Sequence, residues 1–301
     1  MPFRCSSQRR TVCRRRVQLT IADAAPRLRV PFGRIGEFGR CPMRFRFVSS
    51  GVTAPSSPVE ASVDELHAGM VRDVVRSRLV VDPSLRTLSP PEDWRGRDVS
   101  LFEEGVEALL ALEAASGAAR RVMGERVAWH WNNMDVVVGP YMLEDLSDGT
   151  LRVVNYTTAA PGTVDHEDEA GVSGEAQRCR VRRSIVADHG ILDERQYKAC
   201  VYACALADAS GAVVSEVVVR HLRMSGRSSG HAGTAVETLL RFTPLVRRRT
   251  IDIFEHQMTS FVDAAETGGF RCRVSGQCSS CPYAPMCPAQ RPGSEPPTTR
   301  A

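Results

Sequence analysis

The strongest constraint on this chain is a run of three closely spaced cysteines near its C-terminal end. Cys278, Cys281 and Cys287 follow the pattern C-x2-C-x5-C. Two thiolates three residues apart can face one metal ion or cluster from a tight turn, and the third follows after a short spacer. A four-cysteine site needs one more ligand, for which we expect Cys41, with Cys272 in reserve. The beginning and the end of the fold would then be joined through one inorganic centre.

The cysteines allow three interpretations. Ten cysteines spread over 301 residues do not resemble a small secreted scaffold built on disulfides, which disfavours disulfide-bonded or merely free thiols. Four cysteine ligands suit a structural zinc ion as well as an iron–sulfur cluster. We expect a [4Fe–4S] cluster, and zinc stays open as the alternative.

The composition is typical of a globular protein, with 43% hydrophobic and 25% charged residues. The sequence contains no apolar run long enough to cross a bilayer, so we expect no membrane partner. The N-terminal segment is rich in arginine, but no apolar stretch follows it, and a signal peptide is therefore not predicted. A cytoplasmic location with reduced thiols is the expectation, and it favours metal ligation over disulfides.

The basic residues are almost all arginines. Among the 39 basic residues, Lys198 is the single lysine, and the net charge is only +4. Arginine stays protonated and grips phosphate groups in a bidentate way, whereas a lysine amine changes its pKa readily when it is buried. Any mechanism that requires a lysine must therefore use Lys198.

Hydrophobic periodicity predicts an α/β fold with a mixed sheet of about four or five strands flanked by helices. Asp193 is expected to cap a helix, and Asp148-Gly149 to form a hairpin turn. Helices are predicted over 34–47, 60–79, 101–119, 193–207 and 247–266. Strands are predicted over 126–131, 135–142, 151–156, 180–187 and 212–222. One domain is expected over 31–288, between a disordered arginine-rich tail at 1–30 and a disordered tail at 289–301.

Several segments resemble one known family. Residues 39–47, GRCPMRFRF, are similar to the CP-x-R-F-x-F opening of the RecB-type PD-(D/E)XK nucleases. Residues 278–288, CSSCPYAPMCP, resemble the iron–sulfur terminus found in the AddB nuclease domain and the CRISPR-associated adaptation exonuclease. Residues 148–158, DGTLRVVNYTT, resemble the family's DG-x-L-x-V-x-D-Y-K-T strand, and residues 202–207, YACALA, its Q-x-x-x-Y-A-x-A-L helix. The resemblance covers about residues 31–288.

This resemblance implies a PD-(D/E)XK nuclease-like mixed sheet flanked by helices. It implies DNA as the partner, as single strands or duplex ends, in repair, recombination or defence. An active member would hydrolyse phosphodiesters with Mg²⁺ or Mn²⁺ held by carboxylates, supported by a lysine. It also implies four cluster ligands: Cys41, Cys278, Cys281 and Cys287.

The sequence departs from the family at most catalytic positions. Asn155 replaces the second acid and Thr157 replaces the lysine. Asp73 stands where the family usually has histidine, and Lys198 where it has glutamine. One hypothesis is that the hydrolytic site has degenerated, because a lost carboxylate and a lost lysine remove much of the charge stabilisation. The other is that the site has migrated, with Asp73 and Asp135 holding the metal and Lys198 as the electrostatic catalyst.

Two further classes of protein share features with this sequence. The C-x2-C-x5-C pattern also occurs in WhiB-like iron–sulfur regulators, but those chains are much shorter and keep all four cysteines close together. The gap from Cys41 to Cys278 argues against that class. A cluster-stabilised accessory protein without catalysis, for instance one that binds a protein partner in a biosynthetic pathway, stays open as the alternative function.

Overall fold

The computed structural model describes most of the central and C-terminal parts of the chain. The described residues are 27–53, 97–139, 141–157, 179–186, 192–225, 233–275, 278 and 281–290. The helix predicted over 60–79, which carries Asp73, lies outside these ranges, as does the acidic segment 160–177.

Two sheets form the framework, and both contain parallel and antiparallel pairs. Their strands are β1 (Leu28–Pro31), β2 (Arg120–Met123), β3 (Val127–Trp131), β4 (Met134–Val138), β5 (Met142–Asp145), β6 (Leu151–Thr157), β7 (Cys179–Val186), β8 (Val214–Ser225) and β9 (Gly233–Arg241). One sheet has the order β1-β4-β3 and the other the order β2-β5-β6-β8-β9-β7. In the larger sheet β6 and β8 run parallel, whereas β8 and β9 run antiparallel.

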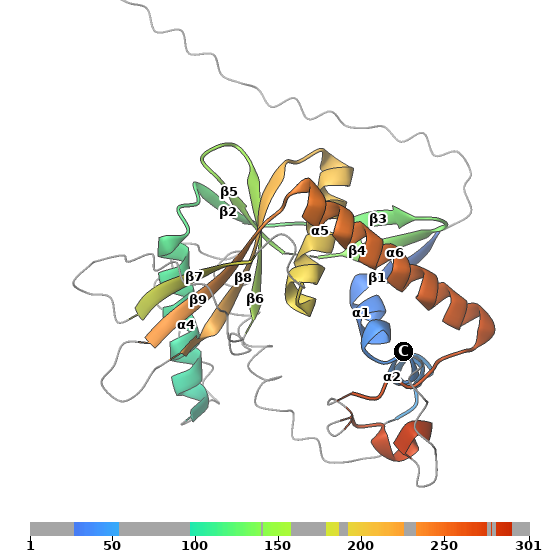
Figure 1. Ribbon diagram of the computed structural model, residues 1–301. Coiled ribbons are helices and arrows are strands. Elements are labelled where there is room, and N and C mark those ends of the chain that lie inside the picture. The colour runs from blue at the N-terminus through green and yellow to red at the C-terminus, as the bar shows by residue number, and fades with distance from the viewer. Residues whose placement is uncertain are drawn as a thin grey trace, which may run out of the picture.

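Helices occupy both faces of the six-stranded sheet. They are α1 (Phe32–Arg40), α2 (Pro42–Ser49), α4 (Arg97–Ala115), α5 (Glu194–Ser210) and α6 (Pro244–Thr267), followed by the short turns η2 (Ala284–Met286) and η3 (Pro288–Gln290). Figure 1 shows α4 on one side of this sheet and α5 on the other. α1 packs against α2 and α6. The described residues that follow α6 (268–275, 278 and 281–290) are called the C-terminal segment. The described fold is therefore α/β with helices flanking mixed sheets, as expected, but the strands form two sheets where one was predicted.

The larger core lies on the α5 side. Val153 of β6 and Val217 of β8 point to this side and meet the buried face of α5, including Cys200 and Tyr202. The alternate residues of the same strands, such as Val218, meet α4 on the other side. This alternation is the period-2 pattern of strands that are covered on both faces.

The number of strands was underestimated from the sequence. The predicted strand 135–142 is divided into β4 and β5 at Gly139, whose φ of 86° lies in the left-handed region. The sequence pattern also missed β1, β2 and β9. β1 falls mainly in the tail that was expected to be disordered up to residue 30, β2 is only four residues long and begins with two arginines, and β9 follows a Gly/Ser-rich stretch.

The helix predicted over 34–47 is two helices. Cys41 stands between α1 and α2 in an extended conformation, with φ of −158° and ψ of 106°. Pro42 explains the break, because proline disfavours helical geometry in the residue before it and is accommodated at the first position of a new helix. The break therefore takes Cys41 out of a helix and places it at a junction.

Other local predictions are confirmed. The side chain of Asp193 caps α5 by accepting hydrogen bonds from the backbone N–H groups of Arg195 and Gln196. The β5–β6 hairpin turns at Asp148 and Gly149, where Asp148 accepts a hydrogen bond from the N–H of Thr150 at 2.9 Å.

The limits of the described structure differ slightly from the expected domain limits. β1 starts at Leu28, before the boundary expected at residue 31, and η3 continues to Gln290, past the boundary expected at residue 288. A search of the described residues finds no helix with the length and apolarity that a membrane crossing needs.

A cluster of buried charges lies in the sheet face that α4 covers. The fully buried guanidinium of Arg220 donates to Glu144 at 2.7 Å and to Glu237 at 2.7 Å. Arg121 and Arg152 donate to Glu144 as well, at 2.8 Å and 3.1 Å. Burial alone would raise the pKa of Glu144, but the hydrogen bonds and charges of Arg220 and Arg121 hold that pKa below its ordinary value.

Candidate functional site

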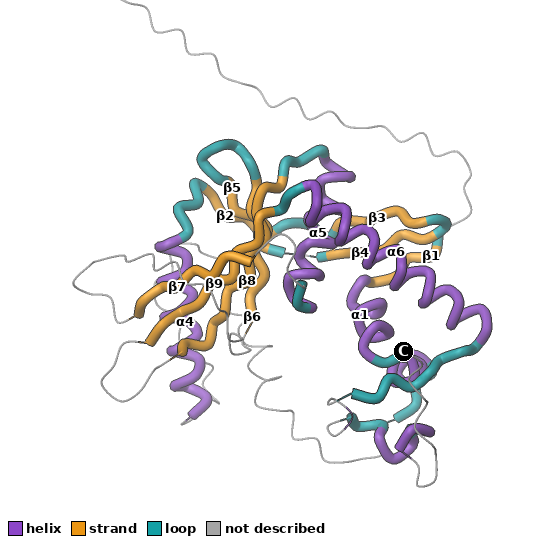
Figure 2. The backbone as a smooth tube through the Cα atoms, viewed as in Figure 1, coloured by secondary structure: helices purple, strands orange, loops and turns teal. Residues whose placement is uncertain are grey.

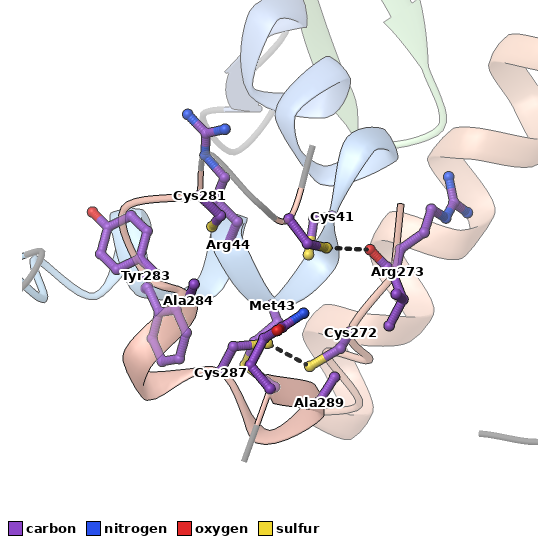
Figure 3. Close-up of a pocket in the computed structure, with 14 residues that line it drawn as sticks. Cys41, Met43, Arg44, Cys272, Arg273, Cys281, Tyr283, Ala284, Cys287 and Ala289 are labelled. Atoms are coloured by element: carbon purple, nitrogen blue, oxygen red, sulfur yellow. Dashed lines mark hydrogen bonds between the residues drawn. The ribbon is translucent and has the colours of Figure 1, made fainter. Parts of the chain in front are cut away.

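Five cysteines line one small cavity, of about 20 Å³, between α2 and the C-terminal segment. We call it the cysteine pocket, and its cysteines are Cys41, Cys272, Cys278, Cys281 and Cys287. Figure 3 shows how Cys41, Cys272 and Cys287 lie around this pocket. Cys41 comes from near the start of the described chain and the other four from its end, so the pocket joins segments that are far apart in sequence.

Backbone hydrogen bonds fix the cysteines in short turns. Cys41 accepts from the N–H of Phe45 at 3.0 Å at the start of α2. In the C-terminal segment, the N–H of Cys281 donates to the carbonyl of Cys278 at 3.2 Å, and the N–H of Cys287 donates to the carbonyl of Ala284 at 3.1 Å. Figure 2 shows this segment as loop with short helical turns. The C-x2-C spacing therefore forms the tight turn that the sequence suggested.

Aromatic side chains attach this segment to α1 and α2. Phe38 makes edge-to-face contacts with Phe45 at 5.9 Å and with Phe270 at 6.4 Å between ring centroids. Phe47 stacks on Tyr283 at 5.4 Å, and the guanidinium of Arg273 donates to the carbonyl of Gly39. Such ring pairs contribute about 0.5–1.5 kcal/mol each beyond the area that they bury.

The side chains of the pocket suit a metal ion or cluster that is bound by cysteine thiolates. Cysteine sulfurs are soft ligands that suit zinc and iron–sulfur clusters. The Sγ atoms of Cys272 and Cys287 lie 3.4 Å apart, and the Sγ of Cys278 lies 3.8 Å from the carbonyl oxygen of Arg273. Burial and the contact with Cys287 raise the pKa of Cys272 to about 11, which favours its protonated thiol.

The cysteine sulfurs line the pocket, but they do not converge on a common metal position. Within the described residues, no three Cys, His, Asp or Glu side chains surround a common position closely enough to chelate a metal ion as they stand. The cysteines nevertheless share one cavity. Binding a centre there therefore requires their side chains to turn inward.

A second cavity, of about 740 Å³, lies where β1, β3, β4 and α5 meet. Its basic side chains are Arg29, Arg126 and Lys198, and we call it the basic cavity. Among its described lining residues there is no aspartate or glutamate. Arginine and lysine side chains around an open cavity favour anions, whereas hard divalent cations need carboxylates.

Lys198 belongs to an ion-pair network on α5. Its Nζ lies 2.5 Å from Oε1 of Glu194, and Arg40 donates to the same carboxylate from Nε at 2.9 Å. Burial would raise the pKa of Glu194, but the hydrogen bonds and charges of Arg40 and Lys198 hold it below its ordinary value. Lys198 also lines a smaller neighbouring cavity, of about 260 Å³, together with Arg40 and Glu194.

Asp135 lies in a different polar group. Its Oδ1 is 2.7 Å from Nδ1 of His130 and 3.7 Å from Nη1 of Arg27, on the three-stranded sheet. Asp135 and Val137 share a face of β4, and Val137 lines the basic cavity. The structure thus places Asp135 on the sheet face that borders the cavity, although Asp135 itself does not line it.

Asn155 and Thr157 lie on β6, facing α5. The amide of Asn155 donates to the backbone carbonyl of Arg195 at 3.4 Å, at the start of the helix that carries Lys198. Thr157 is half-buried at the end of the strand. Both positions lie near α5, but neither residue supplies a charged group. Asp73 lies outside the described residues.

The tyrosine of the YACALA segment has a structural role in this chain. Tyr202 is fully buried and donates from its hydroxyl to the carbonyl of Glu125 at 2.9 Å. A Cβ at Gly124 would lie 2.2 Å from that hydroxyl, and one at Gly139 would lie 2.6 Å from the ring. The two glycines make room for the tyrosine where β3 begins and β4 ends.

Arg29 and Arg126 were not among the residues predicted to form a site. Each is a single arginine among many, and nothing in the local pattern distinguishes it. Their common position is set by the pairing of β1 and β3 with β4, which brings residues about a hundred positions apart to one cavity. Only the topology of the three-stranded sheet could have identified them.

Comparisons with known proteins give little further guidance. No family model matches the chain, and no curated protein matches it. Among solved structures, one similar fold is a crystal structure from Eubacterium rectale named "Putative exonuclease", with 12% sequence identity and a TM-score of 0.49. The match covers 84% of this chain and 87% of that chain.

Proposed function

We propose that this chain is a DNA-binding protein of nuclease-like fold whose ends are joined by a [4Fe–4S] cluster and whose hydrolytic site is incomplete. One observation carries the proposal. Cys41 lines the same cavity as Cys278, Cys281 and Cys287, which are the four positions that match the cysteines of the iron–sulfur nucleases.

The proposed ligands are therefore Cys41, Cys278, Cys281 and Cys287. Bound there, the cluster would serve as a structural cross-link between the α1–α2 junction and the C-terminal segment. The same four thiols could hold zinc, which is the alternative centre. Colour and metal content separate the two: the cluster makes anaerobically purified protein brown with about four irons per chain, whereas zinc leaves it colourless.

The absence of carboxylates among the lining residues of the basic cavity supports an incomplete hydrolytic site. Asn155 offers a neutral amide where the related nucleases have an acid, and Lys198 is already paired with Glu194. Arg29 and Arg126, both exposed, can instead neutralise phosphates of a bound strand without a divalent ion. Binding without cleavage is the expected behaviour.

The test is a binding and cleavage assay with labelled single-stranded DNA and blunt duplexes, in Mg²⁺ or Mn²⁺. The double variant Arg29→Ala/Arg126→Ala should weaken single-strand binding about tenfold or more. It should also lower the slope of log K against log salt by about 1.4, or ~0.7 per lost phosphate contact. Arg34→Ala is the matched control, because Arg34 pairs with Glu37 on α1 and does not line the cavity.

Two outcomes would overturn this proposal in different ways. Metal-dependent cleavage that Asp135→Ala and Lys198→Ala each abolish would show a migrated but working site, with those residues as ligand and electrostatic catalyst. An absence of binding to any DNA by protein with its full metal content would favour the accessory-protein alternative, in which the fold binds a protein partner.

A further inference from the structure

The cysteine pocket contains one more thiol than a four-ligand centre requires. Cys272 is the extra residue if the proposed ligand set holds, and this inference rests on the proposed function to that extent. Cys272 follows α6 and directly precedes Arg273, whose guanidinium is anchored on the carbonyl of Gly39. The residue next to the extra thiol therefore ties this part of the chain to the end of α1.

The partner of Cys272 is one of the proposed ligands. Its Sγ lies 3.4 Å from the Sγ of Cys287, and the two sulfurs face each other across the pocket (Figure 3). Cys287 is held in the turn between η2 and η3, where its N–H donates to Ala284 and its carbonyl accepts from Gln290. A disulfide needs sulfurs about 2.05 Å apart, so bond formation requires the two sulfurs to approach from their separation of 3.4 Å.

Both thiols are also accessible to small oxidants, since Cys272 and Cys287 are each partly exposed. Cys200 and Cys204 provide a contrast within the same chain. They lie one turn apart on α5 and are fully buried, and burial raises the pKa of Cys204 to about 12. Exposure therefore favours oxidation of the pocket cysteines over Cys200 and Cys204, and the sulfur separation of 3.4 Å singles out Cys272 and Cys287 among them.

We propose that Cys272 and Cys287 form a reversible disulfide when the pocket holds no cluster, and that this bond blocks the pocket against metal until it is reduced. The two thiols lose two protons and two electrons, and one sulfur–sulfur bond forms. Hydrogen peroxide accepts the electrons and protons and leaves as two water molecules. A dithiol reductant reverses the reaction by exchange and returns Cys287 to the ligand set.

The experiment starts from full-length protein freed of metal by an anaerobic chelator. One part is treated with stoichiometric hydrogen peroxide, alkylated, and analysed by non-reducing peptide mass spectrometry. We expect a single linkage, Cys272–Cys287, with Cys200 and Cys204 alkylated only after unfolding. Reconstitution with iron and sulfide should fail for the oxidised protein and recover after treatment with dithiothreitol.

The variant Cys272→Ser isolates the role of the extra thiol. It should bind the same amount of iron as wild type, and after peroxide treatment of the metal-free protein it should still be reconstituted without a reductant. A predominant linkage other than Cys272–Cys287, or loss of iron binding in Cys272→Ser, would overturn the inference. The linkage is measured on metal-free protein, so a wrong cluster assignment and a wrong disulfide assignment give different results.

Discussion

The six-stranded sheet and the cysteine pocket both gather reactive polar groups, but they satisfy them differently. In the sheet, the buried Arg220 finds its partners within the chain, in Glu144 and Glu237. In the pocket, the thiols border a cavity, and two of them, Cys272 and Cys287, lie with their sulfurs 3.4 Å apart. The charges of the Arg220 cluster are thus paired within the chain, whereas the proposed [4Fe–4S] centre of the pocket would have to come from outside it.

Removal of the Arg220 side chain should give the largest loss in the free energy of unfolding. Arg220→Met leaves Glu144 and Glu237 buried with fewer partners, and breaking such a pair costs about 3–5 kcal/mol. Urea unfolding followed by circular dichroism measures the loss. Arg34→Met is the control, because its exposed pair with Glu37 contributes at most about 1 kcal/mol. A loss in Arg220→Met no greater than in the control would show that the sheet does not depend on this charge network.

The next largest effect is a pH-dependent contribution of Glu144 to the free energy of unfolding. The folded-state pKa of Glu144 is lowered, so its ionisation contributes stability that is complete above the ordinary value of 4.5 and is lost as pH falls through the folded-state pKa. Glu144→Gln cannot ionise. The difference in unfolding free energy between wild type and Glu144→Gln should be about 2–3 kcal/mol at pH 7 and should shrink in acid. A difference that stays constant from pH 7 to pH 3 would contradict this assignment.

A smaller loss of stability is expected when an aromatic ring that holds the C-terminal segment is removed. Phe270→Ala removes contacts with Phe38 and Phe45, each worth about 0.5–1.5 kcal/mol beyond area burial. Limited proteolysis should therefore cut the C-terminal segment faster, while the unfolding midpoint of the sheet changes little. Loss of stability across the whole sheet in Phe270→Ala would remove the distinction between the two regions.

Sequence patterns located the elements that rest on local chemistry. The Asp193 cap and the Asp148-Gly149 turn are each specified by a few adjacent residues, and the structure has both. The buried charges of β5, β8 and β9 could not be found in this way. A strand residue such as Arg220 reads as solvent-exposed until its cross-strand partner is known, and that partner is seventeen positions away.

The candidate site also contains residues that local motifs predict and residues that only the strand pairing brings together. The cysteine spacing indicated which residues would gather, and Cys41 does line the pocket with the three C-terminal cysteines. The basic cavity depends on how β1 pairs with β4, which no local motif encodes. Asp135 and Lys198, linked by hypothesis into one site, make their described ion pairs with different partners, Arg27 and Glu194.

A shared iron–sulfur centre is tested most directly by the iron and sulfide content of anaerobically purified protein, with Cys41→Ser and Cys272→Ser measured in parallel. We expect about four irons per chain in wild type and in Cys272→Ser, with a marked loss in Cys41→Ser. Wild-type protein that is colourless and holds one zinc, or Cys41→Ser with an undiminished cluster, would contradict the claim that the two ends of this fold share one iron–sulfur centre.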